Sequence, residues 1–195
     1  MKKLSTLLTL GVLLIIIGCS DNPSQSTDPI EEPPPTTNTS PECVDGESDW
    51  KYPCNNIDLL ARVTPSDFSV QPLSGGAAFN DIWGWTDPQT GKEYALVGRV
   101  DGTSFVDVSD PSDPKIVGTL PKPDSASAST WRDIKVYKNY AYIVADNAGP
   151  HGMQVFDLAN LRDSGNSGQT FQATAHYDQV HSAHNVVINT NTAYA

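Results

Sequence analysis

Internal repetition constrains the fold of this chain more than any other feature. Three segments align as the first strands of successive repeats: NDIWGW (80–85), RDIKVY (132–137) and HNVVIN (184–189). Each is followed by a second apolar segment: EYALVG (93–98), NYAYIV (139–144) and NTAYA (191–195). Asp81 and Asp133 are 52 residues apart, as are Asp133 and Asn185. A period of this length predicts a fold assembled from repeated supersecondary units.

Each repeat is expected to contain four short strands. In the second repeat they are DIKVY, YAYIVA, GMQVFDL and QTFQATA, and the apolar residues Ile134 and Val136 alternate with Lys135 as in a strand. Four antiparallel strands in about 50 residues, repeated, are typical of a β-propeller blade. We therefore predict an all-β fold, a β-propeller over residues 76–195, with repeats near 79–130, 131–182 and 183–195.

The third repeat reaches only its second strand, so the sequence holds about two and a half blades. A closed propeller needs about 4–8 blades. An open arrangement would leave strand edges without partners. We therefore expect an incomplete ring, and we interpret the chain as the N-terminal part of a longer protein.

Residues 1–18 have the pattern of a secretory signal peptide. Two lysines precede an apolar run from Leu7 to Ile17, and Gly18 and Cys19 follow. The run is shorter than the roughly 20 residues of a membrane span. The junction IIIGC resembles a bacterial lipobox, which implies that Cys19 carries a lipid and anchors the chain to a membrane. The alternative is a plain signal peptide with an incidental cysteine.

Two further segments precede the repeats. Residues 19–42 are rich in Pro, Ser, Thr and acidic residues, so we expect a disordered tether. Residues 43–75 contain Cys43 and Cys54, which are expected to form a disulfide in an exported protein. Free thiols or a metal-binding pair are the alternatives.

The net charge of the chain is −11, and it becomes −13 without the leader, with 10 basic and 23 acidic residues remaining. Such an acidic protein is not expected to bind nucleic acid or anionic lipid surfaces. The charge is compatible with a solvated protein outside the cell, or with one that collects cations.

Two resemblances follow from longer motifs. FVDVSDPSDPKIVG (105–118) resembles the LVIVD repeat, a propeller-type repeat of bacterial surface proteins. The wider region from about Tyr52 to Ala195, with YPCNNIDLLARV, WRDIKVYKNYAYIVAD and HGMQVFDL, resembles the choice-of-anchor B family. The resemblance implies a cell-surface propeller whose anchor here would be the lipid on Cys19, and it implies no established enzymatic activity.

Polar residues open the first strand of every repeat. If these strands are innermost, one mouth of the propeller channel would gather Asn80, Asp81, Arg132, Asp133, His184 and Asn185. Carboxylates there would hold a hard cation or a polar ligand. In the alternative interpretation, the Asp and Asn side chains fasten their own turns or bond a neighbouring blade.

Three histidines follow an H-x4-H-x2-H spacing, at His176, His181 and His184. Histidine is a common ligand of divalent transition metals, so a possible metal site is one interpretation. The spacing matches no fixed metal motif, and surface or blade-contact histidines are the alternative. His151, in a Gly/Pro loop, is expected to be incidental.

Two other groups of residues have structural interpretations. The aspartates of DVSDPSDP suggest turns rather than a calcium site, because Asp-Pro pairs start turns. Trp83, Trp85 and Trp131 are expected to pack between blades, although exposed tryptophans would stack on sugar rings.

The sequence favours a lipid-anchored surface or envelope protein, exported and held at the outer membrane or cell surface. Its propeller would be a binding or scaffold module for a polysaccharide, peptide or protein partner. The alternatives are a metal-dependent exported enzyme, hydrolase-like, with its site at the channel mouth, and a purely structural envelope component. Fold alone does not decide among them.

Overall fold

The computed structural model describes residues 42–48, 51–165, 168–189 and 193–194. In these residues the chain forms β-strands and one short 3-10 helix, with no α-helix. No helix in this described part is long and apolar enough to cross a membrane. The predicted leader, Cys19 and nearly all of the tether lie outside the described residues.

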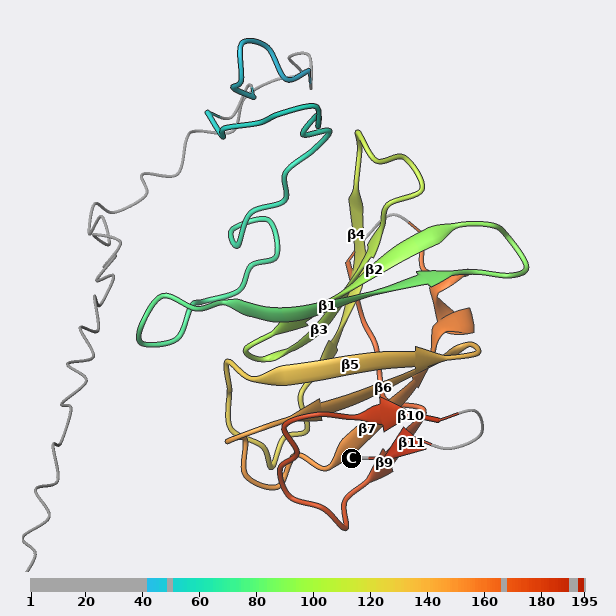
Figure 1. Ribbon diagram of the computed structural model, residues 1–195. Helices are drawn as coiled ribbons and strands as arrows, with labels where there is room; N and C mark the ends of the chain where they lie inside the picture. Colours follow the sequence, from blue (N-terminus) through green and yellow to red (C-terminus); the bar gives the residue numbers. More distant parts are fainter. Residues whose placement is uncertain (1–41, 49–50, 166–167, 190–192, 195) are drawn as a thin grey trace, which may run out of the picture. The chain divides into compact units, whose positions relative to one another are not determined.

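Strands pair into successive antiparallel units, as the repeats predict (Figure 1). The first blade consists, in order, of β1 (Phe79–Thr86), β2 (Glu93–Arg99), β3 (Gly102–Asp107) and β4 (Lys115–Pro121). The second consists of β5 (Arg132–Tyr137), β6 (Tyr140–Ala145), β7 (Met153–Asp157) and β9 (Ala175–Tyr177). A third unit is the pair β10 (Val187–Ile188) and β11 (Ala193–Tyr194). The fold is therefore all-β, with propeller-type blades in an open ring.

The fourth strand of the second blade differs from the prediction. The segment QTFQATA was expected to form it, but β8 (Gln169–Thr170) instead pairs parallel with β4 and adds a fifth strand to the first blade. The chain reaches that edge after the 3-10 helix η1 (Leu158–Leu161). Phe171 accounts for this different pairing of β8, because its ring packs against Phe105. Gly118 leaves room for the ring, since a Cβ at position 118 would lie 2.3 Å from Phe171 Cε2.

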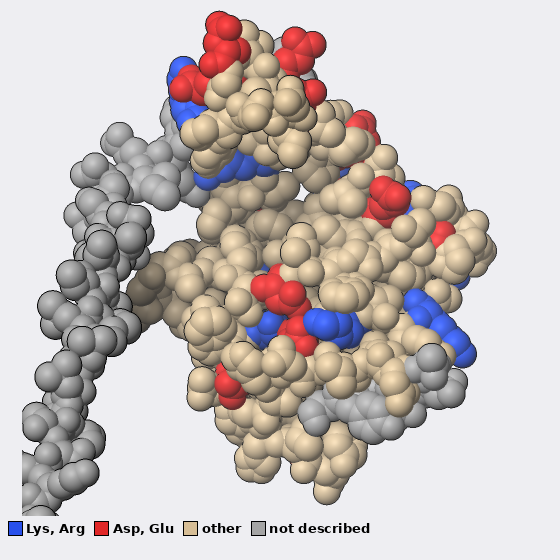
Figure 2. Space-filling model, in the orientation of Figure 1, with Lys and Arg blue, Asp and Glu red and all other residues tan. Residues whose placement is uncertain are grey.

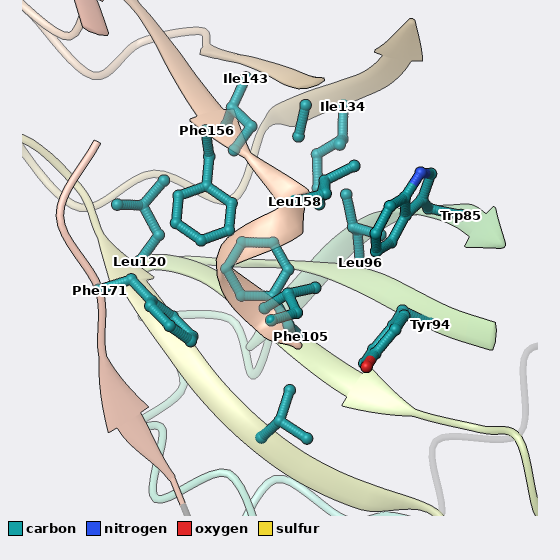
Figure 3. Close-up of a cluster of buried hydrophobic side chains, with 13 residues drawn as sticks. Trp85, Tyr94, Leu96, Phe105, Leu120, Ile134, Ile143, Phe156, Leu158 and Phe171 are labelled. Atoms are coloured by element: carbon teal, nitrogen blue, oxygen red, sulfur yellow. The ribbon is translucent and has the colours of Figure 1, made fainter. Parts of the chain in front are cut away.

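The main hydrophobic core lies between the two blades (Figure 3). Alternate residues of β2 and β3 point toward the second blade, and alternate residues of β6 and β7 point back. Phe105 and Phe156 stack with ring centroids 4.7 Å apart, and Phe171 closes the cluster from the β8 segment. Burial of apolar surface therefore holds the blades together face to face.

A buried ion pair adds a second link between the blades. Asp87 follows β1, and its carboxylate accepts two hydrogen bonds from Arg162, at 2.8 and 2.6 Å. The Arg162 guanidinium holds the pKa of Asp87 well below its ordinary range, so the carboxylate stays ionised although it is buried. The pair fixes the segment after η1 to the β1–β2 turn.

The segment before the repeats contains the expected disulfide. Cys43 and Cys54 are bonded with their Cα atoms 5.9 Å apart, which confirms the pairing. Further along, Phe68 and Val70 pack on Val100 and Val106 of the first blade. The main-chain oxygen of Phe68 accepts a hydrogen bond from Arg99. This segment therefore adheres to the blade at residues 68–70.

Replacing both cysteines by serine is expected to destabilise the 43–58 segment by about 2–3 kcal/mol, because the unfolded segment gains chain entropy. Limited proteolysis should then cut between residues 43 and 58 faster than in the disulfide-bonded protein. Cleavage rates beyond residue 79 serve as the internal control. Equal cleavage of the segment in both proteins would show that the bridge contributes no local stability.

Candidate functional site

The candidate site lies along the first strands of the repeats. β1 and β5 are edge strands of their sheets and lie side by side, and β10 follows next to β5. Asp81 Oδ2 accepts a hydrogen bond from the Ile134 amide at 2.7 Å. One repeat later, Asp133 Oδ2 accepts from the Val186 amide at 2.6 Å. The same contact therefore joins each first strand to the next.

A local irregularity in β1 positions the first of these contacts. The register between β1 and β2 shifts between Phe79 and Ile82, and Asp81 has a φ of 68°. Gly98 on β2 permits this irregular backbone course of β1, because a Cβ at position 98 would lie 2.1 Å from the main-chain oxygen of Asn80. Asn80 Oδ1 then reaches the Arg132 amide at 3.1 Å. Asn80 and Asp81 thus both bond the second blade.

These contacts agree with the interpretation that such side chains bond a neighbouring blade. Asp133 is buried, and its second oxygen pairs with Lys135. Asp81, Asp133 and Asn80 therefore each have a structural partner in the neighbouring repeat. Of the six predicted channel-mouth residues, His184 and Asn185 are exposed.

Arg132 does not lie on an open surface, because its side chain is buried between the blades and only 3% of the residue is exposed. Nε donates to the Arg99 oxygen at 2.8 Å, and Nη1 donates to His151 Nε2 at 2.8 Å. Nη2 has no hydrogen-bond partner among the described residues. Burial lowers the pKa of Arg132 to about 10, so the guanidinium remains charged at neutral pH.

His151 was expected to be incidental, but it is fully buried and bonds Arg132. Its Nδ1 lies 3.0 Å from the Gly152 oxygen, so Nδ1 carries the proton and Nε2 accepts from Arg132. A second proton on Nε2 would face the Arg132 donor. Burial, followed by the nearby positive charge, lowers the pKa of His151 to about 4. No periodic signal in the sequence indicates this role.

Two tryptophans near the first strands are partly exposed, contrary to the expectation that all three pack between blades. Trp85 is buried in the core, whereas Trp83 is 39% and Trp131 is 48% exposed. Lys135 Nζ lies 4.7 Å from the centroid of the Trp83 ring, and Lys135 also pairs with Asp133. This cation–π contact holds the Trp83 ring against β5.

Trp131 has a comparable setting. Its ring centroid lies 6.1 Å from that of His184, and His184 Nδ1 donates to Asp146 Oδ2 at 3.0 Å. The hydrogen bond from His184 holds the pKa of Asp146 below its ordinary value. Figure 2 shows acidic and basic side chains gathered together over the region of β1 and β5. Each exposed tryptophan therefore lies beside charged hydrogen-bonding groups. Sequence reasoning missed Lys135 and Asp146.

The three candidate metal-binding histidines have separate roles. His176 Nε2 bonds the His151 oxygen at 2.7 Å, and His184 pairs with Asp146. The His181 main-chain oxygen accepts from the amides of His151 and Gly152, both at 2.9 Å. Within the described ranges, no three His, Cys, Asp or Glu side chains form a group suited to a metal ion. The proposed histidine site is therefore not assembled there.

Replacing Asp133 by alanine is expected to lower the free energy of unfolding by about 1–3 kcal/mol, because the buried Val186 amide loses its acceptor. Asp133→Asn keeps an oxygen acceptor and should lose less. Urea unfolding measures both. Asp110→Ala is the matched control, since Asp110 lies in an exposed turn and bonds Ser112. Equal losses for Asp133→Ala and Asp110→Ala would contradict the fastening role.

Comparison with known families supports the repeat assignment. The LVIVD repeat matches the chain twice, at residues 92–120 and 130–157. The first match spans β2, β3 and nearly all of β4, and the second spans β5 to β7. The chain is thus consistent with an LVIVD-repeat protein, whose repeats form propeller-type blades. No curated protein and no solved structure matches it significantly.

Proposed function

We propose that this protein is an exported, surface-anchored binding module that holds a polysaccharide along the first strands of its blades. The observation that carries the proposal is the partial exposure of Trp83 and Trp131 beside charged groups. The apolar face of a sugar ring stacks on an exposed indole, while hydroxyl groups bond nearby polar side chains. The LVIVD repeats supply the propeller-like frame.

The electrostatics favour a neutral polysaccharide. The net charge of −11 would repel an acidic glycan. Lys135 and Asp133 neutralise one another beside Trp83, and His184 and Asp146 bond each other beside Trp131. These pairs offer both donors and acceptors without a strong local field. A neutral glycan therefore fits this surface better than a nucleic acid or an acidic polymer.

The anchor is the second part of the proposal. The lipobox-like junction at Cys19, the tether over residues 19–42 and the wider resemblance to the choice-of-anchor B family support a lipid-anchored envelope protein. The tether would hold the blades away from the membrane, where an extracellular polysaccharide is accessible. Metabolic labelling with a fatty acid should label the wild-type chain, and Cys19→Ala should remain unlabelled.

Titration of the protein with soluble neutral polysaccharides (a glucan, a mannan and a xylan) tests the binding function. We expect quenching of tryptophan fluorescence by at least one of them. Trp83→Ala or Trp131→Ala should weaken that binding about 2- to 12-fold, the equivalent of about 0.5–1.5 kcal/mol for one aromatic contact.

Tyr177→Ala is the matched control, because Tyr177 is an exposed aromatic residue on the outer strand β9. This variant should bind like the wild type. Absence of binding to all three glycans, or equal affinity of the tryptophan variants and the wild type, would overturn the proposal.

A further inference from the structure

Asp146 fixes the orientation of the His184 ring beside Trp131. The main-chain amide of Asp146 donates to the Trp131 oxygen at 3.0 Å, so these two residues are joined through their backbones. The Ser129 hydroxyl adds to this link, because it donates to the Asp146 oxygen and accepts from the Trp131 amide. The Asp146 carboxylate then holds His184 at Nδ1 through Oδ2. Trp131, Asp146 and His184 therefore position one another.

The hydrogen bond to Asp146 also decides which nitrogen of His184 carries the proton. The hydrogen bond from His184, followed by that from the Asn147 amide, holds the pKa of Asp146 below its ordinary value. An ionised carboxylate is only an acceptor, so Nδ1 must be the donor. In the neutral ring, Nε2 then has a lone pair and accepts hydrogen bonds.

Nε2 is the part of the His184 ring that is left for a ligand. Among the described residues it has no hydrogen-bond partner, and 63% of the His184 side chain is exposed. The centroids of the His184 and Trp131 rings are 6.1 Å apart, a spacing comparable with the width of one sugar ring. A sugar that stacks on the exposed part of the indole therefore brings hydroxyl groups at its edge next to the imidazole.

Trp83 has no comparable acceptor beside it. Lys135 Nζ lies over its ring and already donates to Asp133 and to the Ile134 oxygen. A lysine ammonium has donors and no acceptor, and the Asp133 carboxylate is buried. An exposed acceptor nitrogen therefore distinguishes the surface beside Trp131 from the surface beside Trp83.

We propose that His184 Nε2 accepts a hydrogen bond from a hydroxyl group of the sugar ring that stacks on Trp131. Asp146 is the positioning residue that keeps Nε2 an acceptor. The inference rests on the proposed glycan-binding function and adds the chemical feature that the site recognises. The stacked ring must have a free hydroxyl group at its edge, because an O-acetylated oxygen has no proton to donate. The ligand is therefore an unsubstituted neutral polysaccharide.

Nitrogen NMR spectra of the full chain at pH 7.5 identify the tautomer without any ligand. Wild-type His184 should have its proton on Nδ1 and none on Nε2. Asp146→Ala should lose this preference, whereas Asp146→Asn should keep it, because the amide oxygen still accepts from Nδ1. His181, an exposed histidine of the same loop, should give the same spectrum in all three proteins. A proton on Nε2 of wild-type His184 would overturn the proposal.

Titration with whichever of the glucan, mannan and xylan binds best tests the contact with the ligand. His184→Asn keeps a donor for Asp146 but has no atom in the place of Nε2. Its binding should be about 2- to 12-fold weaker than that of the wild type, as expected for one hydrogen bond. His184→Gln, which can place an amide oxygen near that position, should recover part of the loss. The O-acetylated form of the same glycan should bind the wild type and His184→Asn equally.

His181→Asn is the matched control and should bind like the wild type. If His184→Asn binds as tightly as the wild type while Trp131→Ala binds weakly, this proposal fails and the proposed function stands. If the wild type binds none of the three glycans, both fail.

Discussion

Replacing Phe156 by alanine is expected to lower the free energy of unfolding by about 3–5 kcal/mol. Phe156 is 1% exposed, and its ring lies 4.7 Å from that of Phe105 and 5.1 Å from that of Phe171, measured between centroids. These three rings come from β7, β3 and the β8 segment. Removing the Phe156 ring leaves a cavity between the two blades. The surrounding strands cannot close this cavity without disturbing their backbone hydrogen bonds.

Urea unfolding monitored by circular dichroism measures this loss. Tyr177→Ala is the matched control, because it removes a similar volume from an exposed position and should cost less than about 1 kcal/mol. A single transition in both proteins would show that the blades unfold together. A Phe156→Ala variant as stable as Tyr177→Ala would mean that the interface between the blades contributes little.

Acidification from pH 7.5 to pH 5 is expected to destabilise the protein by about 2 kcal/mol through His151 alone. The folded protein has a pKa of about 4 at this residue, below the ordinary value of 6.5. The unfolded chain therefore takes up the proton first as the pH falls, and stability decreases. The stabilisation is complete above pH 6.5 and is lost progressively between pH 6.5 and pH 4. The structural cause is burial, with Arg132 donating to Nε2.

Urea unfolding of the wild type and of His151→Gln at pH 7.5 and pH 5 tests the direction of this pH dependence of stability. The variant should lose the His151 component of the pH dependence, whatever its stability at pH 7.5. His181→Gln, a change at an exposed histidine, should keep the wild-type dependence. An unchanged difference between the two pH values in His151→Gln would show that this histidine does not resist protonation in the folded protein.

Much of the local structure could be predicted from the repeats. The segment RDIKVY coincides with β5, and the segments from Glu93 and from Asn139 became β2 and β6 within one residue. Alternation of apolar residues reports which side of a strand is buried, and this information is local. The pairing of Cys43 with Cys54 was also predictable, since the sequence has two cysteines close together in a chain that it predicts to be exported.

The site was harder to predict, because its residues act on partners far along the chain. The positions of Asp81 and Asp133 were apparent from the repeat, and bonding to a neighbouring blade was one of two interpretations of them. Only the structure decides for it, because the next first strand lies beside each of them. Arg132 occupies the same repeat position as Asn80 and nevertheless is buried beside His151. Two residues at the same position of successive repeats have similar backbone surroundings. The direction that a long side chain takes depends on the side chains around it.

The amino-acid sequence by itself determined the repeat, the strand order, the alternation of buried residues and the disulfide. Only the tertiary structure decided that β8 joins the first blade, that Trp83 and Trp131 remain partly exposed, and that Ile82 is exposed. The physical reason is that hydrophobic periodicity and strand propensity are properties of a single strand and its own residues. Which surface covers a given face depends on contacts between residues 50 or more positions apart, such as Phe171 with Phe105 and Arg162 with Asp87.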